Sequence, residues 1–132
     1  MAPNNVKNGT ENPRVAGCCR VSTAGQVKDK DEEKESLPGQ RKLIKAHTSL
    51  KGWDLSGMYE DAGITGKKDD RPGLQGLMDA AKLRAFDIVV VRDLSRFGRS
   101  ARDLLNNTKS LMDHGMVFVS LKENIELSNN NP

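Results

Sequence analysis

The protein has 132 residues, of which 36% are hydrophobic and 30% are charged, and its formal net charge is +3. This length suits one globular domain with its own core. No apolar run approaches the roughly 20 residues needed to span a bilayer, and residues 1–12 hold no apolar signal segment. We therefore expect a cytoplasmic protein without membrane contact.

The first half of the chain predicts a strand, a helix and a second strand. Residues 1–12 are expected to form a disordered leader, and residues 15–19, small and apolar, a buried strand. A polar loop over 23–35 then leads to Ser36 and Pro38, which are helix-start signals. The helix should end near Gly52 and bury a stripe made of Leu37, Leu43, Ile44, His47 and Leu50. Residues 53–59 predict the second strand.

The second half continues the alternation after a loop rich in Gly, Lys and Asp over 61–71. Pro72 should start a helix that buries Leu74, Leu77, Met78 and Ala81, spaced i, i+3, i+4 and i+7. Residues 87–91 predict a strand buried on both faces, because residues 88–91 are β-branched and continuous. Ser100 and Asp103 resemble a capping box. The helix that follows should bury Leu104, Leu105, Thr108, Leu111 and Met112, and residues 116–121 should form the last strand before a frayed end over 128–132.

Strands that alternate with helices predict an α/β fold, with a mostly parallel central sheet flanked by helices. Ligands of such sheets bind outside the carboxyl ends of the strands. Ser22 follows the first predicted strand, and residues 92–99 follow the strand over 87–91. The fold therefore predicts that both segments lie on one rim. The adjacent cysteines, Cys18 and Cys19, are expected to be buried strand residues, because a disulfide between them would be badly strained.

The chemistry that this rim suggests is attack on a phosphate by a serine. Ser22 lies two residues after Arg20, and arginines recur at Arg71, Arg96 and Arg99. Guanidinium groups stay charged and grip two phosphate oxygens at once. One preorganised donor is worth roughly 3 kcal/mol in a transition state, so attack without a metal is energetically reasonable. If residues 96–99 are helical, Arg96 and Arg99 point the same way.

Several motifs, taken in order, resemble the catalytic domain of the serine recombinases, the resolvase and invertase family, over about residues 14–127. The middle segments are most similar to its large members, the transposases and phage-type integrases. The motifs are Arg20-Val21-Ser22-Thr23 with Gln26, then Ser36 and Gln40, then residues 59–66, then Asp70-Arg71-Pro72, then residues 93–100.

This resemblance implies a site-specific recombinase that cleaves and rejoins DNA without a metal or other cofactor. Ser22 would attack the phosphate, form a 5′-phosphoserine bond and release a 3′-hydroxyl. Arg20, Arg71, Arg96 and Arg99 would bind the phosphate and stabilise charge. Gln26, Gln40, Asp61 and Ser95 match supporting positions, although smaller members have an acid at the place of Ser95. Many members also have an aromatic residue where Cys18 stands.

The resemblance also implies partners. The DNA recombination site of a mobile element is the expected substrate, and the parent protein is expected to be a dimer that assembles into a tetramer on DNA. The catalytic domain is expected over residues 13–127, without the family's long assembly helix or DNA-binding domain. We therefore expect a fragment of a larger protein that is monomeric or weakly associating.

Two other functions fit the alternating pattern. One is a non-catalytic nucleotide-binding or regulatory module on the same sheet, and the other is a metal-dependent nuclease. Single residues also allow simpler interpretations. These are a turn serine at 22, solvated arginines at 92, 96, 99 and 102, a helix-preceding arginine at 71, surface glutamines at 26 and 40, and a turn-shaping Asp61.

Overall fold

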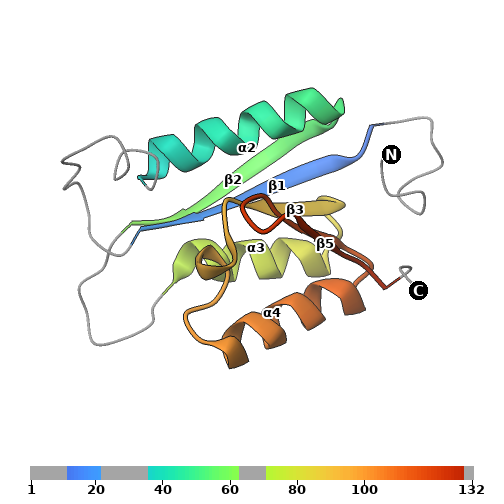
Figure 1. Ribbon diagram of the computed structural model, residues 1–132. Coiled ribbons are helices and arrows are strands. Elements are labelled where there is room, and N and C mark those ends of the chain that lie inside the picture. The colour runs from blue at the N-terminus through green and yellow to red at the C-terminus, as the bar shows by residue number, and fades with distance from the viewer. Residues whose placement is uncertain (1–11, 22–35, 63–70, 130–132) are drawn as a thin grey trace.

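A computed structural model describes residues 12–21, 36–62 and 71–129 (Figure 1). Ser22, Gln26, the expected loop over 23–35, residues 1–11 of the expected leader and residues 130–132 of the expected frayed end lie outside these residues. The elements are β1 (Arg14–Arg20), α2 (Leu37–Lys51), β2 (Asp54–Asp61), α3 (Pro72–Lys82), β3 (Ile88–Val91), the 3-10 turn η1 (Leu94–Arg96), α4 (Ala101–Asp113), β4 (Val117–Ser120) and β5 (Ile125–Leu127).

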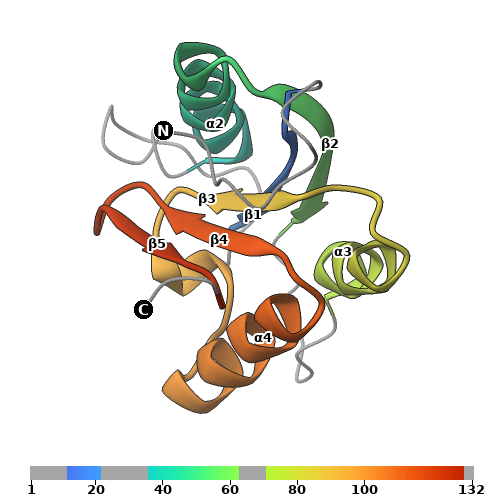
Figure 2. The same cartoon turned by 90° about the vertical axis from the view of Figure 1, so that its right-hand side faces the viewer.

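The strands form one sheet in the order β2-β1-β3-β4-β5. The first four strands in this order are parallel, and β5 runs antiparallel to β4. Helix α2 covers one face, while α3 and α4 cover the other (Figure 2). The predicted mostly parallel sheet with helices on both sides is confirmed. Strand β5 was not predicted, because its three residues, Ile-Glu-Leu, are too few for their alternation to indicate a strand.

Two apolar layers separate the sheet from its helices. Ala16 and Cys18 of β1 face α3 and α4, whereas Val15 and Cys19 face α2. Both cysteines are buried free thiols, as predicted. Strand β3 is buried at every position, because helices cover it from both sides.

Helix α2 begins and ends where the sequence predicts, but its buried face differs. Ser36 caps it, with its hydroxyl accepting a hydrogen bond from the Gly39 N–H at 3.2 Å, and Gly52 ends it at φ 75°. The residues buried along it are Gln40, Ile44 and Thr48. Leu50, 83% exposed, and Leu43, 41% exposed, do not belong to the core, so this part of the predicted stripe is wrong. Two polar residues occupy the core-facing row because each has an internal hydrogen-bond partner.

The other two helices follow their predicted patterns more closely. Pro72 starts α3, which buries Leu77 and Ala81 and packs Leu74 and Met78 against the same core. In α4 the Ser100 hydroxyl accepts a hydrogen bond from the Asp103 N–H at 3.1 Å, as a helix cap does.

The buried residues of α4 are Thr108 and Leu111. Leu105 is 67% exposed, so its predicted place on the inner face is wrong. It lies about 100° around the helix from Leu104, outside the buried row. Among the described residues, none of the helices combines the length and apolarity needed to cross a membrane.

Candidate active site

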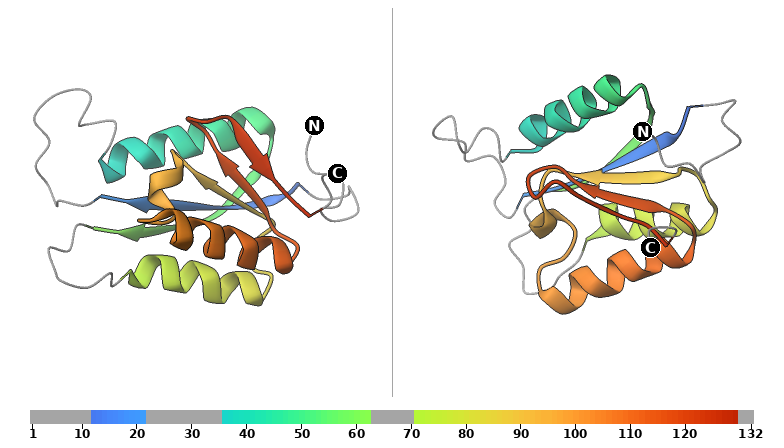
Figure 3. Two further views of the ribbon diagram at one scale, coloured as in Figure 1. Left: turned by 60° about the horizontal axis from the view of Figure 1, so that its bottom comes forward. Right: turned by 45° about the vertical axis from the view of Figure 1, so that its right-hand side comes forward.

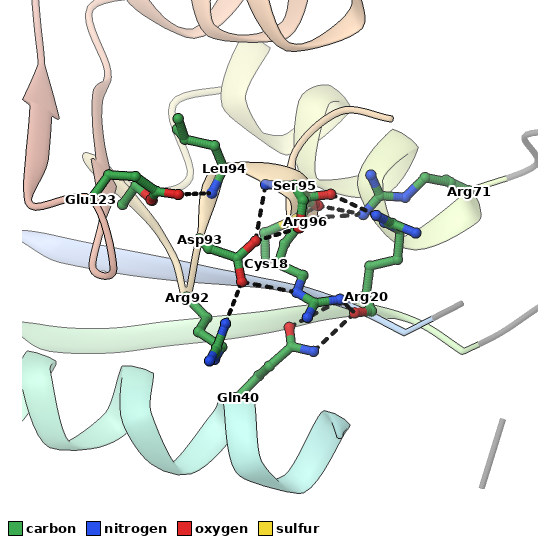
Figure 4. Close-up of polar contacts among 11 residues, drawn as sticks. Cys18, Arg20, Gln40, Arg71, Arg92, Asp93, Leu94, Ser95, Arg96 and Glu123 are labelled. Carbon is green, nitrogen blue, oxygen red and sulfur yellow. Dashed lines mark hydrogen bonds and ion pairs between the residues drawn. The ribbon is translucent and has the colours of Figure 1, made fainter. Parts of the chain in front are cut away.

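Three parallel strands end at one edge of the sheet and bring distant polar residues together there. Arg20 ends β1, Asp61 ends β2, and Asp93 with η1 follows β3. Figure 3 shows these ends at the same edge, and Figure 4 shows the side chains that meet beside them. Arg20 and the 92–99 segment therefore share a rim, as the fold predicts.

Gln40 reaches from α2 to the last residue of β1. Its Oε1 accepts a hydrogen bond from the Arg20 N–H at 3.1 Å, and its Nε2 donates to the Arg20 carbonyl at 2.9 Å. The side chain is completely buried, so the interpretation of Gln40 as a surface residue is wrong. This pair of bonds continues the hydrogen bonding of β1 where the neighbouring strand no longer supplies it, and it fixes the peptide that precedes Val21.

Arg20 and Arg96 hold each other through main-chain carbonyls. Nη1 of Arg96 donates to the Arg20 carbonyl at 2.9 Å, and Nη2 of Arg20 donates to the Ser95 carbonyl at 2.6 Å. Nε of Arg96 donates to Oδ2 of Asp93 at 3.3 Å. The two guanidinium groups are therefore held in defined positions between β1 and η1.

Arg71 joins this cluster from the start of α3. Its Nε donates to Oδ2 of Asp61 at 3.0 Å, and its Nη2 donates to the Arg96 carbonyl at 2.9 Å. The remaining nitrogen, Nη1, is buried and has no hydrogen-bond partner among the described residues. Leaving a buried donor unsatisfied costs about 1–3 kcal/mol, so an acceptor that reached this nitrogen would remove that cost.

Asp61 does more than shape a turn. Besides binding Arg71, it accepts hydrogen bonds from the N–H groups of Gly73 at 2.6 Å and Leu74 at 3.0 Å. Asp61, a residue of β2, thus caps α3, and its negative charge interacts favourably with the partial positive charge at the N-terminus of that helix. Gly73 allows the close approach, because a Cβ there would lie 2.4 Å from the Glu60 carbonyl oxygen.

Arg99 lies apart from Arg96, because η1 is too short to place both on one helical face. The turn ends at Arg96, and Arg99 is exposed. Arg99 and Arg71 both line an open cleft of about 570 Å³ between α3 and α4, with Leu74 and Met78 among the other lining residues. Arg96 and Arg99 therefore do not point the same way along one helix, as they would if residues 96–99 were helical. Arg99 nevertheless lies near the arginine cluster.

The cluster is strongly cationic. Burial lowers the pKa of Arg20, and the nearby charges of Arg71, Arg96 and Arg99 lower it further. Burial by itself raises the pKa of Asp93. The hydrogen bonds from Ser95 and Arg92, with the charges of Arg96 and Arg92, outweigh that effect and lower the pKa. The arrangement thus favours an anionic ligand.

Asp93 belongs to the motif over 93–100, but the sequence predicted no role for it in the site. Its Oδ1 accepts hydrogen bonds from the Ser95 N–H at 3.0 Å and from the Ser95 hydroxyl. Its Oδ2 accepts bonds from Arg96 and, at 2.5 Å, from Nη1 of Arg92. Arg92 is therefore mostly buried in an ion pair and is not a solvated surface charge. The signal of Asp93 in the sequence is that of a helix N-cap, because aspartate is a preferred residue at the start of a helix.

Metal ligands do not gather in the same way. Across residues 12–21, 36–62 and 71–129, no group of three or more His, Cys, Asp or Glu side chains is placed to hold a metal ion. Asp61 and Asp93 each bind arginines instead of facing a common space.

Comparison with known proteins assigns the family. The sequence model of the family described as "Resolvase, N terminal domain" matches residues 15–132. The chain belongs to the resolvase family. It is 30% identical over 119 residues to a resolvase of Clostridium perfringens, covering 89% of this chain and 54% of that protein. It is 39% identical over 71 residues to the DNA-invertase of Escherichia phage P1, covering 54% and 37% of the two chains.

A solved structure of the same family has the same fold. The N-terminal catalytic domain of TP901-1 integrase superposes with a TM-score of 0.75 at 34% identity, covering 86% of this chain and 81% of that one. The resolvase resemblance predicted from the motifs is confirmed, as is the resolvase-like catalytic domain fold. The chain spans about half the length of the Clostridium resolvase.

Proposed function

We propose that this chain cleaves and rejoins DNA in a site-specific recombinase, with Ser22 as the nucleophile. The observation that carries the proposal is the contact of Arg20, Arg71 and Arg96 at one edge of the sheet, with the buried Nη1 of Arg71 lacking a partner among the described residues. A phosphate oxygen would satisfy that nitrogen and is a stronger acceptor than the carbonyls that the arginines now bind.

In the proposed reaction the Ser22 oxygen bonds to phosphorus and the bond from phosphorus to the DNA 3′ oxygen breaks. The serine loses its proton to a base, and the departing 3′ oxygen gains one and becomes a hydroxyl. Negative charge increases on the phosphate oxygens during this step, and it is stabilised by Arg20, Arg71, Arg96 and Arg99. Each such donor is worth about 3 kcal/mol, although contributions of neighbouring groups do not add simply.

Rejoining reverses these steps, with a DNA 3′-hydroxyl attacking the phosphoserine. Each step exchanges one phosphoester bond for another, so the reaction needs no ATP. Charge stabilisation by guanidinium groups supports a reaction that is independent of metal. The parent protein would act as a dimer that assembles into a tetramer on its DNA site, in the cytoplasm of its host.

The proposal is tested by trapping the covalent intermediate. Full-length protein that contains this sequence is mixed with DNA duplexes in the presence of EDTA, which removes divalent metal ions. The central segment of each duplex is randomised in sequence and carries a nick, so that the cleaved end diffuses away and cannot be rejoined. We expect a protein–DNA adduct that survives detergent with the wild type and is absent with Ser22→Ala. Ser49→Ala changes an exposed serine of α2 and should retain the adduct.

Two results would overturn the proposal. One is an adduct that persists in the Ser22→Ala variant. The other is DNA cleavage that requires magnesium and leaves no adduct, which would favour a metal-dependent nuclease. Saturable nucleotide binding at the rim, without any DNA cleavage, would instead favour a regulatory module.

A further inference from the structure

The carboxylate of Asp93 is the point where the η1 turn and the arginine cluster are joined. Asp93 is 6% exposed and follows β3 by two residues. One of its oxygens binds the backbone and hydroxyl of Ser95, and the other binds Arg92 and Arg96 (Figure 4). A single buried carboxylate thus fixes both the start of the turn and one of the guanidinium groups.

The turn that Asp93 caps presents two carbonyl oxygens to the other arginines. The Ser95 carbonyl accepts the bond from Nη2 of Arg20 at 2.6 Å, and the Arg96 carbonyl accepts the bond from Nη2 of Arg71 at 2.9 Å. These carbonyls point toward β1 and α3 only while η1 keeps its shape. The orientations of Arg20 and Arg71 therefore depend on the same cap.

Arg96 is oriented at two places along its guanidinium. Nε binds Asp93 at 3.3 Å and Nη1 binds the Arg20 carbonyl at 2.9 Å. Two bonds to separate acceptors fix the plane of the group as well as its position. Loss of the Asp93 charge would weaken the bond at Nε and so loosen the orientation of the plane.

We propose that Asp93 is a positioning residue that orients Arg96 directly, and Arg20 and Arg71 through the η1 carbonyls, for binding of the scissile phosphate. This inference rests on the proposed function. Asp93 touches no reacting atom in this account. It acts by keeping the phosphate-binding donors in one geometry before the DNA arrives.

The ordinary alternative is that Asp93 only stabilises the fold. Asp87 provides a control, because it is a partly buried carboxylate that binds both an arginine and a backbone N–H. It accepts hydrogen bonds from the Arg14 N–H at 2.8 Å and from Arg14 Nε at 3.2 Å. It precedes β3 and so lies at the opposite edge of the sheet. Asp87→Asn and Asp93→Asn are the same chemical change with different consequences for the cluster.

The test measures the rate and the final yield of adduct formation with DNA in excess over full-length protein. A fraction of unfolded protein lowers the yield, whereas misplaced arginines lower the rate constant. We expect Asp93→Asn to slow the reaction by between about tenfold and a hundredfold, as small misplacements of catalytic groups do. Asp87→Asn should keep the wild-type rate constant.

A second measurement follows the Arg96 Nε–H by nitrogen-15 NMR. Its exchange with solvent should be slow in the wild type and in Asp87→Asn, and fast in Asp93→Asn. Should Asp93→Asn fail to fold, Ser95→Ala, which keeps the backbone bond to Asp93, should still slow adduct formation, but less. If Asp93→Asn folds, a rate constant equal to that of Asp87→Asn would overturn the inference. If it does not fold, a rate constant of Ser95→Ala equal to that of the wild type would overturn it. Absence of any adduct from the wild type would instead overturn the proposed function.

Discussion

The side-chain amide of Gln40 hydrogen-bonds both the N–H and the carbonyl of Arg20, at 3.1 Å and 2.9 Å. A fully buried glutamine of α2 thus acts as a short piece of neighbouring strand for the end of β1. The same Arg20 carbonyl accepts the bond from Arg96, so Gln40 supports the arginine cluster as well as the strand.

Replacing Gln40 should therefore lower the stability of the protein. Gln40→Glu keeps the size and the acceptor but cannot donate to the Arg20 carbonyl, and it adds a buried charge. We expect the free energy of unfolding to fall by about 2–4 kcal/mol, since the change leaves buried polar groups unsatisfied. Urea denaturation measures this loss. The same change at the exposed Gln75 of α3 should alter stability by less than about 0.5 kcal/mol.

Arg71→Lys tests whether the fork of the guanidinium matters or only its charge. A lysine cannot bind Asp61 and the Arg96 carbonyl while also keeping a free donor in a fixed direction. We expect adduct formation to slow by at least about a hundredfold, because an oriented donor is lost.

The control for this change is Arg41→Lys. Arg41 binds both oxygens of Glu60 at 2.9 Å and 2.8 Å, near the same strand end but outside the cluster. Its rate should stay within about twofold of the wild type, as expected for a partly exposed ion pair. Equal effects of the two changes would show that the fork at Arg71 has no special role.

The lowered pKa of Asp93 makes its contribution to stability depend on pH. A carboxyl whose pKa is lowered by folding stabilises the protein above its unfolded pKa, about 3.9, and loses that contribution as pH falls through the lower folded value. The difference in unfolding free energy between the wild type and Asp93→Asn should therefore be largest above about pH 5 and shrink toward pH 2. A difference that stays constant over this range would contradict the contacts described for Asp93.

The two cysteines should react slowly with thiol reagents. Burial raises the pKa of Cys18 to about 11 and that of Cys19 to about 12, so almost no thiolate is present at pH 8. We expect iodoacetamide to modify the folded protein far more slowly than the urea-unfolded chain. Fast labelling of the native protein at pH 8 would show that β1 opens readily.

Sequence reasoning recovered the elements whose signals are local. Ser36, Pro72 and Gly52 are caps or helix starts whose effect depends on adjacent residues, and the order of strands and helices followed from them. The run over 88–91 was recognised because both of its faces are covered, which makes every position apolar.

The errors arose where tertiary contacts overrode polarity. Gln40 is buried because Arg20, 20 residues away, satisfies its amide, and Leu50 is exposed because no element of the described residues covers that side of α2. No role in the site was predicted for Asp93, because its bonds to Ser95 and Arg96 form only in the folded turn. The motif resemblance pointed to the arginines, but it did not show that main-chain carbonyls hold them.

The central claim is that Ser22 becomes joined to a DNA phosphate held by these arginines, and peptide mass spectrometry of the trapped adduct tests it most directly. Digestion with nuclease and protease should leave a nucleotide linked through its 5′ phosphate to the peptide that contains Ser22, and the other DNA end should carry a 3′-hydroxyl. A nucleotide on any other residue, or a phosphate left at the 3′ end, would contradict the account.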